Sequence, residues 1–435
     1  MGRPLHADRI ARLGTENAFK IGVDIRLCEA EGKKVVRLNL GEPDFDTPAP
    51  INERAIREIA AGNSHYCDPQ GLLSFRESVA RRIQRTRGIP VSADQVVVTP
   101  GAKPPIMYTI LSYVNPNDEV IYPSPGFPIY ESAVQFVGGV PVPLHLEESR
   151  GFRFTAADVE KLISPRTRVI ILNSPSNPTG GVLTKQDIEA LADVVRRRCA
   201  PDVRIYSDEV YEDILFDGAT HASIASCEGM QERTIVVSGH SKSFSMTGWR
   251  LGYAVLPNRV EAEVFKNLNV NLISCTPPFV QLAGEEAHEN PAIPPIVAGM
   301  VSQFQERRDW VVPALNAIPG VTCAKPMGAF YAFPNVGGVC ESLGILAAWS
   351  SMPRERRERT SPATIFQRFA LYQHAVATMD RRSFGRIGSE GKHYLRLSTA
   401  TALPTLQEGV RRLAAAAADR AGFEWWFAKG EHLGA

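Results

Sequence analysis

The chain has 435 residues, a length that predicts two domains rather than one core. Its 48 Lys and Arg residues against 47 Asp and Glu give a net charge of +1, so no electrostatic feature predicts nucleic acid or an anionic membrane as a partner. The 7 cysteines form no CxxC pair, and we find neither a secretory signal nor a membrane span. This pattern excludes a disulfide framework and a zinc site as first expectations and predicts a cytoplasmic protein.

Short apolar segments in the middle of the chain predict β-strands, because they are rich in Val and Ile and bounded by Pro, Gly, Ser or Asp. These segments are Gln95–Thr99, Glu119–Tyr122, Arg168–Asn173, Arg204–Ser207, Thr234–Ser238 and Gly252–Leu256. Helical stretches such as Leu72–Arg85 and Lys185–Arg198 separate some of them. The alternation predicts an α/β fold with a mostly parallel central sheet between helices.

The pattern changes after about residue 295. The elements expected there are a long helix at Val297–Ile318, a strand at Ala329–Phe333, a helix near Ala363–Ala377 and a strand at Tyr394–Ser398. The first forty-odd residues do not join the central pattern either. We therefore expect a large domain of residues 49–295 and a smaller α/β domain built from both chain ends, residues 1–48 and 296–435.

Four motifs carry polar side chains in positions that suit chemistry. They are SPSNPTGG (Ser174–Gly181), YSDEVYED (Tyr206–Asp213), SGHSKSFSMTGWRLGY (Ser238–Tyr253) and YLRLS (Tyr394–Ser398). Taken singly, each has an ordinary structural interpretation, such as a turn, a helix cap or a surface ion pair. Their order along the chain and their spacing favour a shared site.

Lys242 follows an apolar strand and has small neighbours, which leave room for a planar ligand beside its amine. Burial would lower the pKa of that lysine, and the neutral amine is the form that attacks an aldehyde. Arg250 follows eight residues later, where its guanidinium can hold a phosphate with two parallel hydrogen bonds. Asp208 ends another strand, and a carboxylate there can keep a pyridine nitrogen protonated.

With these motifs in order, the chain resembles the class I aminotransferases, which are fold-type-I pyridoxal-5'-phosphate (PLP) enzymes, and within them the bacterial aspartate and broad-specificity enzymes. The resemblance runs from about Arg37 to Thr399. It implies that Lys242 forms the Schiff base with PLP and moves the proton, and that Asp208 pairs with the pyridine nitrogen. It also implies that Tyr211 and Asn177 bind the ring hydroxyl.

The resemblance assigns further residues to the cofactor and the substrate. Phe127 stacks on the ring, and backbone N–H groups of Gly101, Ala102 and Lys103 bind the phosphate together with Arg250. Arg396 binds the substrate α-carboxylate, assisted by Gly41 and Asn177. Tyr66 reaches the phosphate of the neighbouring subunit, which implies a homodimer with shared active sites. The partners implied are an α-amino acid and a 2-oxo acid.

Several segments depart from the family pattern, and all fall on the substrate side. His240 is either a packed histidine or a second acid/base near the cofactor. Glu16, if it faces the substrate, would favour a cationic side chain, whereas Lys103 would favour an acidic one. The Arg381-Arg382 loop adds two positive charges near the expected entrance, and Gly337–Ser361 is extra sequence.

Within Gly337–Ser361, the run RERRER at Arg354–Arg359 predicts a solvated helix or loop face rather than a binding patch. The tail Phe423–Ala435, with Trp425-Trp426, has no recognised counterpart in the family.

Two enzyme reactions remain open at this point. A PLP-dependent transaminase and a PLP enzyme of β- or γ-elimination or substitution would use the same lysine, ring partner and carboxylate clamp. A regulatory protein with a DNA-binding module is disfavoured, because only about 40 residues precede GEPDF and they show no helix-turn-helix pattern.

Overall fold

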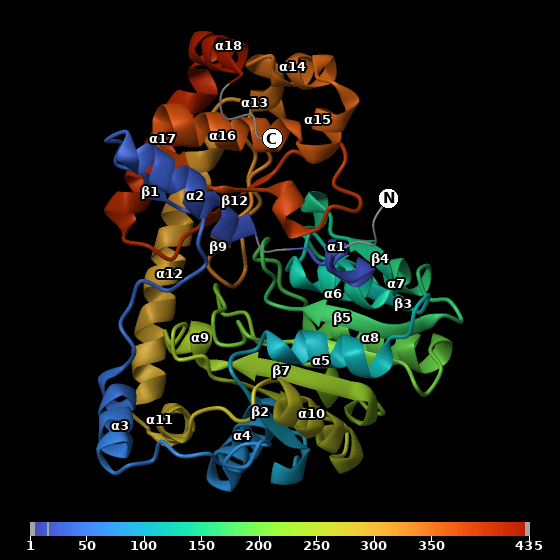
Figure 1. Ribbon diagram of the computed structural model, residues 1–435. Coiled ribbons are helices and arrows are strands. Elements are labelled where there is room, and N and C mark those ends of the chain that lie inside the picture. The colour runs from blue at the N-terminus through green and yellow to red at the C-terminus, as the bar shows by residue number, and fades with distance from the viewer. Residues whose placement is uncertain (1–4, 15–16, 431–435) are drawn as a thin grey trace.

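The structure, a computed structural model, describes residues 5–14 and 17–430. Figure 1 shows a lower part around a large twisted sheet and an upper part of helices, with α12 running along one side from the lower part to the upper. The helix α12 (Ile293–Asn316) crosses the expected domain boundary at residue 296. The division into residues 49–295 and the two chain ends stays a prediction.

Seven strands form the central sheet, in the order β2-β8-β7-β6-β5-β3-β4. Their bounds are β2 Val96–Thr99, β3 Glu119–Ser124, β4 Val140–His145, β5 Thr167–Asn173, β6 Arg204–Asp208, β7 Thr234–Gly239 and β8 Gly252–Val255. Only β8 runs antiparallel to its neighbours β2 and β7, and the other pairs are parallel. The predicted α/β fold with a mostly parallel sheet is confirmed.

Helices cover both faces of this sheet because successive side chains of each strand point to opposite sides. Val169 and Ile171 of β5 belong to the cluster that includes α5, α6 and α10, whereas Ile170 and Leu172 pack on the other side with α8. The bounds in this part are α3 Ala49–Ala60, α4 Leu73–Arg87, α5 Pro104–Tyr113, α6 Ile129–Val137, α7 Ala156–Glu160, α8 Lys185–Arg198, α9 His240–Ser243, α10 Arg259–Leu272 and α11 Pro278–Glu289.

The upper part joins the two chain ends. Strand β1 (Val36–Arg37) pairs with β10 (Val376–Ala377), and β12 (Leu395–Ser398) lies between β11 (Met379–Asp380) and β9 (Tyr331–Ala332). The helices there are α2 Asn17–Ala30, α13 Gly337–Ser342, α14 Ile345–Ser351, α15 Arg354–Arg359, α16 Pro362–His374, α17 Leu403–Ala418 and α18 Arg420–Lys429. A short α1 (Asp8–Ala11) contacts α6.

All six predicted central strands are present, but β4 was not predicted. Its Pro141 and Pro143 argue against a strand, and the structure places β4 at the sheet edge, where a missing N–H is tolerated. The predicted helix near Ala363–Ala377 ends earlier than expected. Ala375 adopts a left-handed conformation with φ of 52°, so α16 stops at His374 and the next residues form β10.

The C-terminal tail adds to the core of the upper part. Trp426 on α18 is 1% exposed and packs with Phe423 against Phe369 of α16. Within the part of the chain that the structure describes, no helix is both long enough and apolar enough to cross a membrane.

Candidate active site

The site lies at one edge of the central sheet, where the predicted motifs meet. Strands β3, β5, β6 and β7 are parallel, so their carboxyl ends lie at the same edge. Asp208 ends β6, and Lys242 lies on α9 directly after β7. Arg250 precedes β8, which runs in the opposite direction and therefore starts at this edge. Crevices beyond the carboxyl ends of parallel strands are the usual ligand sites of such sheets.

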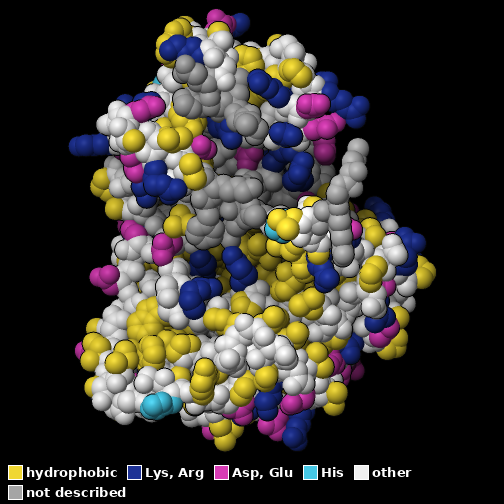
Figure 2. All heavy atoms as spheres, viewed as in Figure 1, with side chains coloured by type: hydrophobic (Ala, Val, Ile, Leu, Met, Phe, Trp, Pro, Cys, Tyr) yellow, Lys and Arg dark blue, Asp and Glu magenta, His cyan; other side chains and the backbone are white. Residues whose placement is uncertain are grey.

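A cavity of about 440 Å³ opens there, between the sheet and the upper part of the molecule. Figure 2 shows Lys and Arg side chains gathered in the hollow between the two parts, above an apolar surface. Ten of the predicted site residues line the cavity. They are Gly41, Ala102, Lys103, Phe127, Asn177, Asp208, Tyr211, Lys242, Arg250 and Arg396.

Lys242 is half-buried, and its amine is held at the cavity wall. Its Nζ donates a hydrogen bond of 2.6 Å to the carbonyl oxygen of Gly41, which links the sheet edge to the N-terminal segment. The Nζ atom also lies 5.8 Å from the centre of the Phe330 ring. These contacts direct the amine into the cavity rather than toward solvent.

Asp208 is buried, and its carboxylate has one strong internal hydrogen bond. The Tyr130 hydroxyl donates to Asp208 Oδ2 at 2.6 Å, and the backbone N–H of Val210 lies 3.4 Å from Oδ1. Burial raises the pKa of Asp208 to about 6, although the hydrogen bond from Tyr130 opposes that shift. A carboxyl group in this environment is ionised most favourably when a cationic ligand lies beside it.

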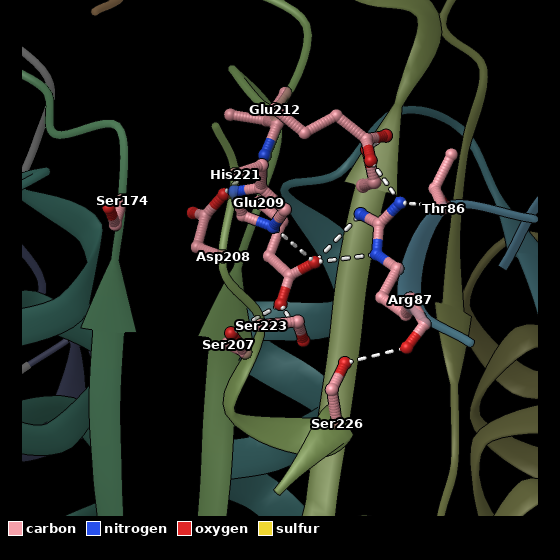
Figure 3. A network of polar contacts seen from close by, with 12 residues as sticks. Thr86, Arg87, Ser174, Ser207, Asp208, Glu209, Glu212, His221, Ser223 and Ser226 are labelled. Carbon is pink, nitrogen blue, oxygen red and sulfur yellow. Dashed lines mark hydrogen bonds and ion pairs between the residues drawn. The ribbon is translucent and has the colours of Figure 1, made fainter. Parts of the chain in front are cut away.

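A polar network lies behind Asp208, on the far side of the same strand end. Figure 3 shows the Asp208 and Glu209 side chains leaving the chain in different directions, with Glu209 directed at Arg87. Arg87 Nη2 donates to Glu209 Oε2 at 2.7 Å and its Nη1 pairs with Glu212. His221 Nε2 lies 2.9 Å from Glu209 Oε2.

The network holds its carboxylates as anions. Burial alone would raise the pKa of Glu209, but Arg87 and His221 outweigh burial and hold that pKa well below its usual value. Burial is likewise outweighed at Glu212, where Arg87 and Arg82 lower the pKa to about 2. This network fixes the segment that carries Asp208 and Tyr211.

Arg396 of β12 closes the cavity from the upper part. Its Nη1 donates to Asn177 Oδ1 at 3.1 Å and its Nη2 to the Asn39 carbonyl oxygen at 2.5 Å. The guanidinium carbon lies 4.6 Å from the centre of the Tyr331 ring and 4.8 Å from that of Phe384. The guanidinium is thus buried and held at the cavity wall, where it can bind a carboxylate with two parallel hydrogen bonds.

Gly101 and Arg250 form a compact cradle at the opposite end of the cavity. Gly101 has φ of 85°, and a Cβ atom there would lie 2.2 Å from Arg250 Nη2. Only glycine therefore allows the guanidinium to lie against this loop. Arg250 is exposed and donates to the carbonyl oxygens of Thr247 and Pro100, at 2.7 and 3.3 Å. Together with the N–H groups before α5, this cradle suits a phosphate.

Two predicted residues are not part of this cavity. Tyr66 is 88% exposed and does not line it within one chain. Gly101 contributes through the cradle beside Arg250 rather than as a lining residue. Glu16 lies outside the described residues, so its orientation stays a prediction.

Two residues that depart from the family pattern, His240 and Arg381, are buried away from the cavity. His240 is buried and stacks on His288 with ring centres 4.6 Å apart, and it does not line the cavity. Burial lowers the pKa of His240 to about 3, so the packed interpretation holds and the second acid/base role is disfavoured. Arg381 was expected near the entrance, but it is buried and donates to the Gly385 carbonyl at 2.7 Å and to Ser124 Oγ at 2.8 Å.

Sequence reasoning missed two tyrosines of the site. Tyr130 lies three residues after Phe127 at the start of α6, a helical spacing that could have placed both rings on one side. The Tyr331 hydroxyl lies 2.7 Å from that of Tyr211, and no motif marks it. A Cβ atom on Gly41 would lie 2.0 Å from the Tyr331 hydroxyl, which explains the glycine in the GEPDF motif.

The arrangement of these groups suits a ligand with an aldehyde, a ring nitrogen and a phosphate, and Arg396 beside it suits a carboxylate. The comparisons with known proteins agree. The sequence profile of the family described as "Aminotransferase class I and II" matches residues 33–413. Aspartate aminotransferase from Rhizobium meliloti (strain 1021) is 36% identical over 414 residues, which are 94% of this chain and 95% of the relative.

Two further comparisons support the same family. Aromatic-amino-acid aminotransferase 2 from Thermococcus litoralis is 36% identical over 380 residues, 87% of this chain and 90% of the relative. A crystal structure of an aspartate aminotransferase from Rhizobium meliloti superposes with a TM-score of 0.84 at 33% identity, covering 95% of this chain and 99% of that one.

The chain belongs to the aminotransferase class I and II family. It is a PLP-dependent transaminase that moves an amino group between an α-amino acid and a 2-oxo acid. The family relatives favour transamination over the elimination or substitution chemistry that the sequence left open.

Proposed function

We propose that the 440 Å³ cavity binds PLP and one amino acid at a time, with Lys242 as the covalent attachment point. The observation that carries this proposal is the convergence of Lys242, Asp208 and Arg396 on one cavity. PLP bound there supplies an aldehyde that bonds to amines and a pyridine ring that withdraws electrons from the substrate α-carbon.

Four parts of the cofactor would be held: its ring nitrogen, ring face, ring hydroxyl and phosphate. The Asp208 carboxylate pairs with the ring nitrogen and keeps it protonated, which in turn keeps Asp208 ionised. Phe127 packs on the ring face. Tyr211 and Asn177 bind the ring hydroxyl. The phosphate is bound by Arg250 and by the backbone N–H groups of residues 101–103 at the start of α5.

The substrate is oriented by Arg396 and acted on by Lys242. Arg396 binds the α-carboxylate with two parallel hydrogen bonds, with Asn177 and the backbone at Gly41 beside it. Lys242 Nζ would take the proton from the substrate α-carbon and pass it to the cofactor, and in the second half of the reaction it would move a proton in the opposite direction, to the α-carbon of the 2-oxo acid. The Gly41 carbonyl, 2.6 Å from Nζ, keeps the amine near that position.

The amino acid has an acidic side chain in this proposal. Lys103 lines the cavity with its ammonium 5.5 Å from the centre of the Phe127 ring, so a positive charge lies beside the expected ring position. Aspartate aminotransferases among the relatives agree with this choice. We expect kcat/KM to be higher for aspartate than for phenylalanine or arginine, and Lys103→Met to reduce that preference at least about tenfold.

Two subunits share each active site in this proposal. Tyr66 is exposed and does not line the cavity of its own chain, and a homodimer would bring its hydroxyl to the partner's phosphate. In a mixed dimer of Tyr66→Phe and Lys242→Ala chains, the lysine-bearing site receives the intact tyrosine. That site should bind PLP as the wild type does, whereas the Tyr66→Phe homodimer should bind it more weakly. A fully active monomer would refute sharing.

We also propose a cytoplasmic location, supported by seven free cysteines.

The experiment that tests the lysine is borohydride reduction of the loaded enzyme followed by peptide mapping. The label should fall on Lys242, and Lys242→Ala should lose turnover. Lys266→Ala removes a half-buried lysine outside the cavity and serves as the control. A label on any other lysine would refute the assignment. Mass spectrometry of the products distinguishes the reactions, since a 2-oxo acid indicates transamination and released ammonia indicates elimination.

A further inference from the structure

A second cavity, of about 930 Å³, lies in the upper part of the molecule and shares no lining residue with the first. Its walls are α14 and α15, the side of α6 that carries Glu131, and the segment from Arg382 to His393. Figure 2 shows basic and acidic side chains gathered over α15. Two of the departures from the family pattern, the Gly337–Ser361 insertion and the Arg381-Arg382 loop, therefore meet at this cavity, whose lining residues are separate from those of the transamination site.

Positive charge exceeds negative charge around this cavity. The lining residues include four arginines (Arg354, Arg357, Arg382 and Arg386) and three glutamates (Glu131, Glu358 and Glu390). Two of the glutamates are already engaged. Glu358 pairs with Arg354 at 2.7 Å, and Glu131 accepts hydrogen bonds from Tyr122 at 2.7 Å and from the backbone N–H of Arg386 at 3.2 Å.

Arg382 and Arg386 donate hydrogen bonds to carbonyl oxygens, and among the described residues neither forms an ion pair with a carboxylate. Arg382 donates to the carbonyls of Thr360 and Glu358, each at 2.7 Å, and Arg386 Nη2 lies 3.4 Å from the Glu358 carbonyl. Burial lowers the pKa of Arg382, and the nearby Arg386 lowers it further. Two guanidinium groups at one wall, close enough to affect each other, favour an anion between them.

Buried donors at the same cavity lack acceptors. Arg357 Nε and Trp349 Nε1 are both shielded from solvent, and within residues 5–14 and 17–430 neither has a hydrogen-bond partner. The two side chains lie together, with the Arg357 guanidinium carbon 5.9 Å from the centre of the Trp349 ring. Buried donors are nearly always paired in folded proteins, so these two predict an acceptor supplied by a ligand.

The cavity also offers apolar surface and a size suited to an organic molecule. Leu346, Trp349 and Ile387 line it, and ligand cavities usually measure about 300–1,000 Å³. A bare inorganic ion would use only a small part of that space. The chemistry that fits is an oxygen-rich anionic group attached to a small apolar body.

We propose that this cavity binds a small organic anion, whose carboxylate or phosphate accepts hydrogen bonds from Arg357 and Trp349 while its apolar part packs on Trp349 and Leu346. Arg386 and Arg382 supply the remaining positive charge. The proposal concerns a second binding site and does not depend on which amino acid the transaminase uses.

Titration of the PLP-loaded enzyme with phenyl phosphate and, separately, with benzoate tests the proposal. The loaded cofactor blocks the phosphate cradle at Arg250, and the visible cofactor band reports any binding at Arg396. Calorimetry should show one site per chain that leaves this band unchanged, with quenching of tryptophan fluorescence that Trp349→Phe abolishes. A preference for phenyl phosphate would identify the group as phosphate, and a preference for benzoate as carboxylate.

Matched arginine variants provide the controls. Arg357→Gln should weaken binding about tenfold or more, and so should Arg386→Gln, which changes an exposed side chain and should not disturb folding. Arg359→Gln removes the same charge from α15 at a position that does not line the cavity, and it should bind like the wild type. The proposal would be overturned if the wild type showed no binding at about 10 mM ligand, or if the Arg357→Gln and Arg386→Gln variants bound with the affinity of the wild type.

Discussion

Asp208 and Glu209 are consecutive acids at the end of β6, but their carboxylates have different partners within the chain. Both are buried, with exposures of 6% and 1%. Glu209 is paired with Arg87 and surrounded by hydroxyl and imidazole groups of the same chain. Asp208 lines the cavity and has the Tyr130 hydroxyl as its strong internal hydrogen bond.

The opposite pKa shifts of Glu209 and Asp208 show which carboxylate is paired within the chain and which can pair with a ligand. A buried carboxylate is costly unless it is paired. At Glu209 the pair is internal, so the pKa is low and the network stabilises the strand end. At Asp208 the pKa is raised to about 6, so ionisation of this group favours a bound cation. The ion pair of Glu209 with Arg87 stabilises the strand end. Asp208, which lines the cavity and has a raised pKa, should favour the binding of a cationic ligand.

Breaking the internal pair should have the largest effect on folding. We expect Arg87→Leu to lower the free energy of unfolding by about 3–5 kcal/mol, because it leaves Glu209 and Glu212 buried without their main cation. Urea unfolding at pH 7 measures this. Arg81→Gln, which removes an exposed arginine paired with Glu289 at 3.2 Å, should cost less than about 1 kcal/mol. Equal losses in the two variants would contradict the comparison.

The Arg87 effect should also depend on pH. The pKa of Glu212 is about 2 in the folded chain and 4.5 when unperturbed. A lowered pKa of this kind stabilises the fold above the unperturbed value, and that stability is lost as the pH falls toward 2. The difference between wild type and Arg87→Leu should therefore shrink as the pH decreases from about 5 to 3. A difference that grows with acidity would refute the assignment.

Replacing the acid of the cavity should instead affect turnover. We expect Asp208→Asn to lower kcat by about 10²–10³-fold, because the amide cannot keep the ring nitrogen of PLP protonated. Steady-state kinetics measures this, and the visible cofactor band shows that PLP remains bound. Near-native turnover in the loaded variant would remove Asp208 from its proposed role.

The same substitution should stabilise the protein without its cofactor. The pKa of Asp208 rises from 3.8 to about 6, so the cost of its buried charge is absent below pH 3.8 and complete above pH 6. We expect the PLP-free Asp208→Asn variant to be more stable than the wild type by about 2–3 kcal/mol at pH 7, and by much less at pH 4. Urea unfolding of both PLP-free proteins at the two pH values tests this, and a less stable variant at pH 7 would contradict it.

The smallest effect on turnover is expected when the hydrogen bond from Tyr130 to Asp208 is removed. Tyr130→Phe removes a 2.6 Å donor to a charged group, worth about 1.5–3 kcal/mol. We expect kcat to fall by about tenfold, because the pKa of Asp208 rises further and its pairing with the ring nitrogen weakens. Tyr122→Phe is the matched control, because it removes a tyrosine hydroxyl that donates to the carboxylate of Glu131. This variant should leave kcat unchanged.

Much of the fold and of the cofactor site could be predicted from local sequence. The strand before Lys242, the small residues around it and the spacing to Arg250 lie within one segment, Ser238–Tyr253, so neighbouring residues fix their relative positions. The carboxyl end of β6 fixes Asp208 in the same way. The prediction failed at β4, where Pro141 and Pro143 conceal a strand that only its edge position permits.

The sequence by itself determined the α/β class, the order of the central strands along the chain and most of the predicted residues that line the 440 Å³ cavity. These follow from short-range spacing, because parallel strands bring their following loops to one edge. The tertiary structure alone decided the contacts between distant segments. Arg396 binds Asn177 across 219 residues, and Tyr211 meets Tyr331 across 120. It also buried Arg381 and brought Arg357 and Arg386 to one cavity, because such contacts depend on how the upper part packs and leave no periodic signal in the chain.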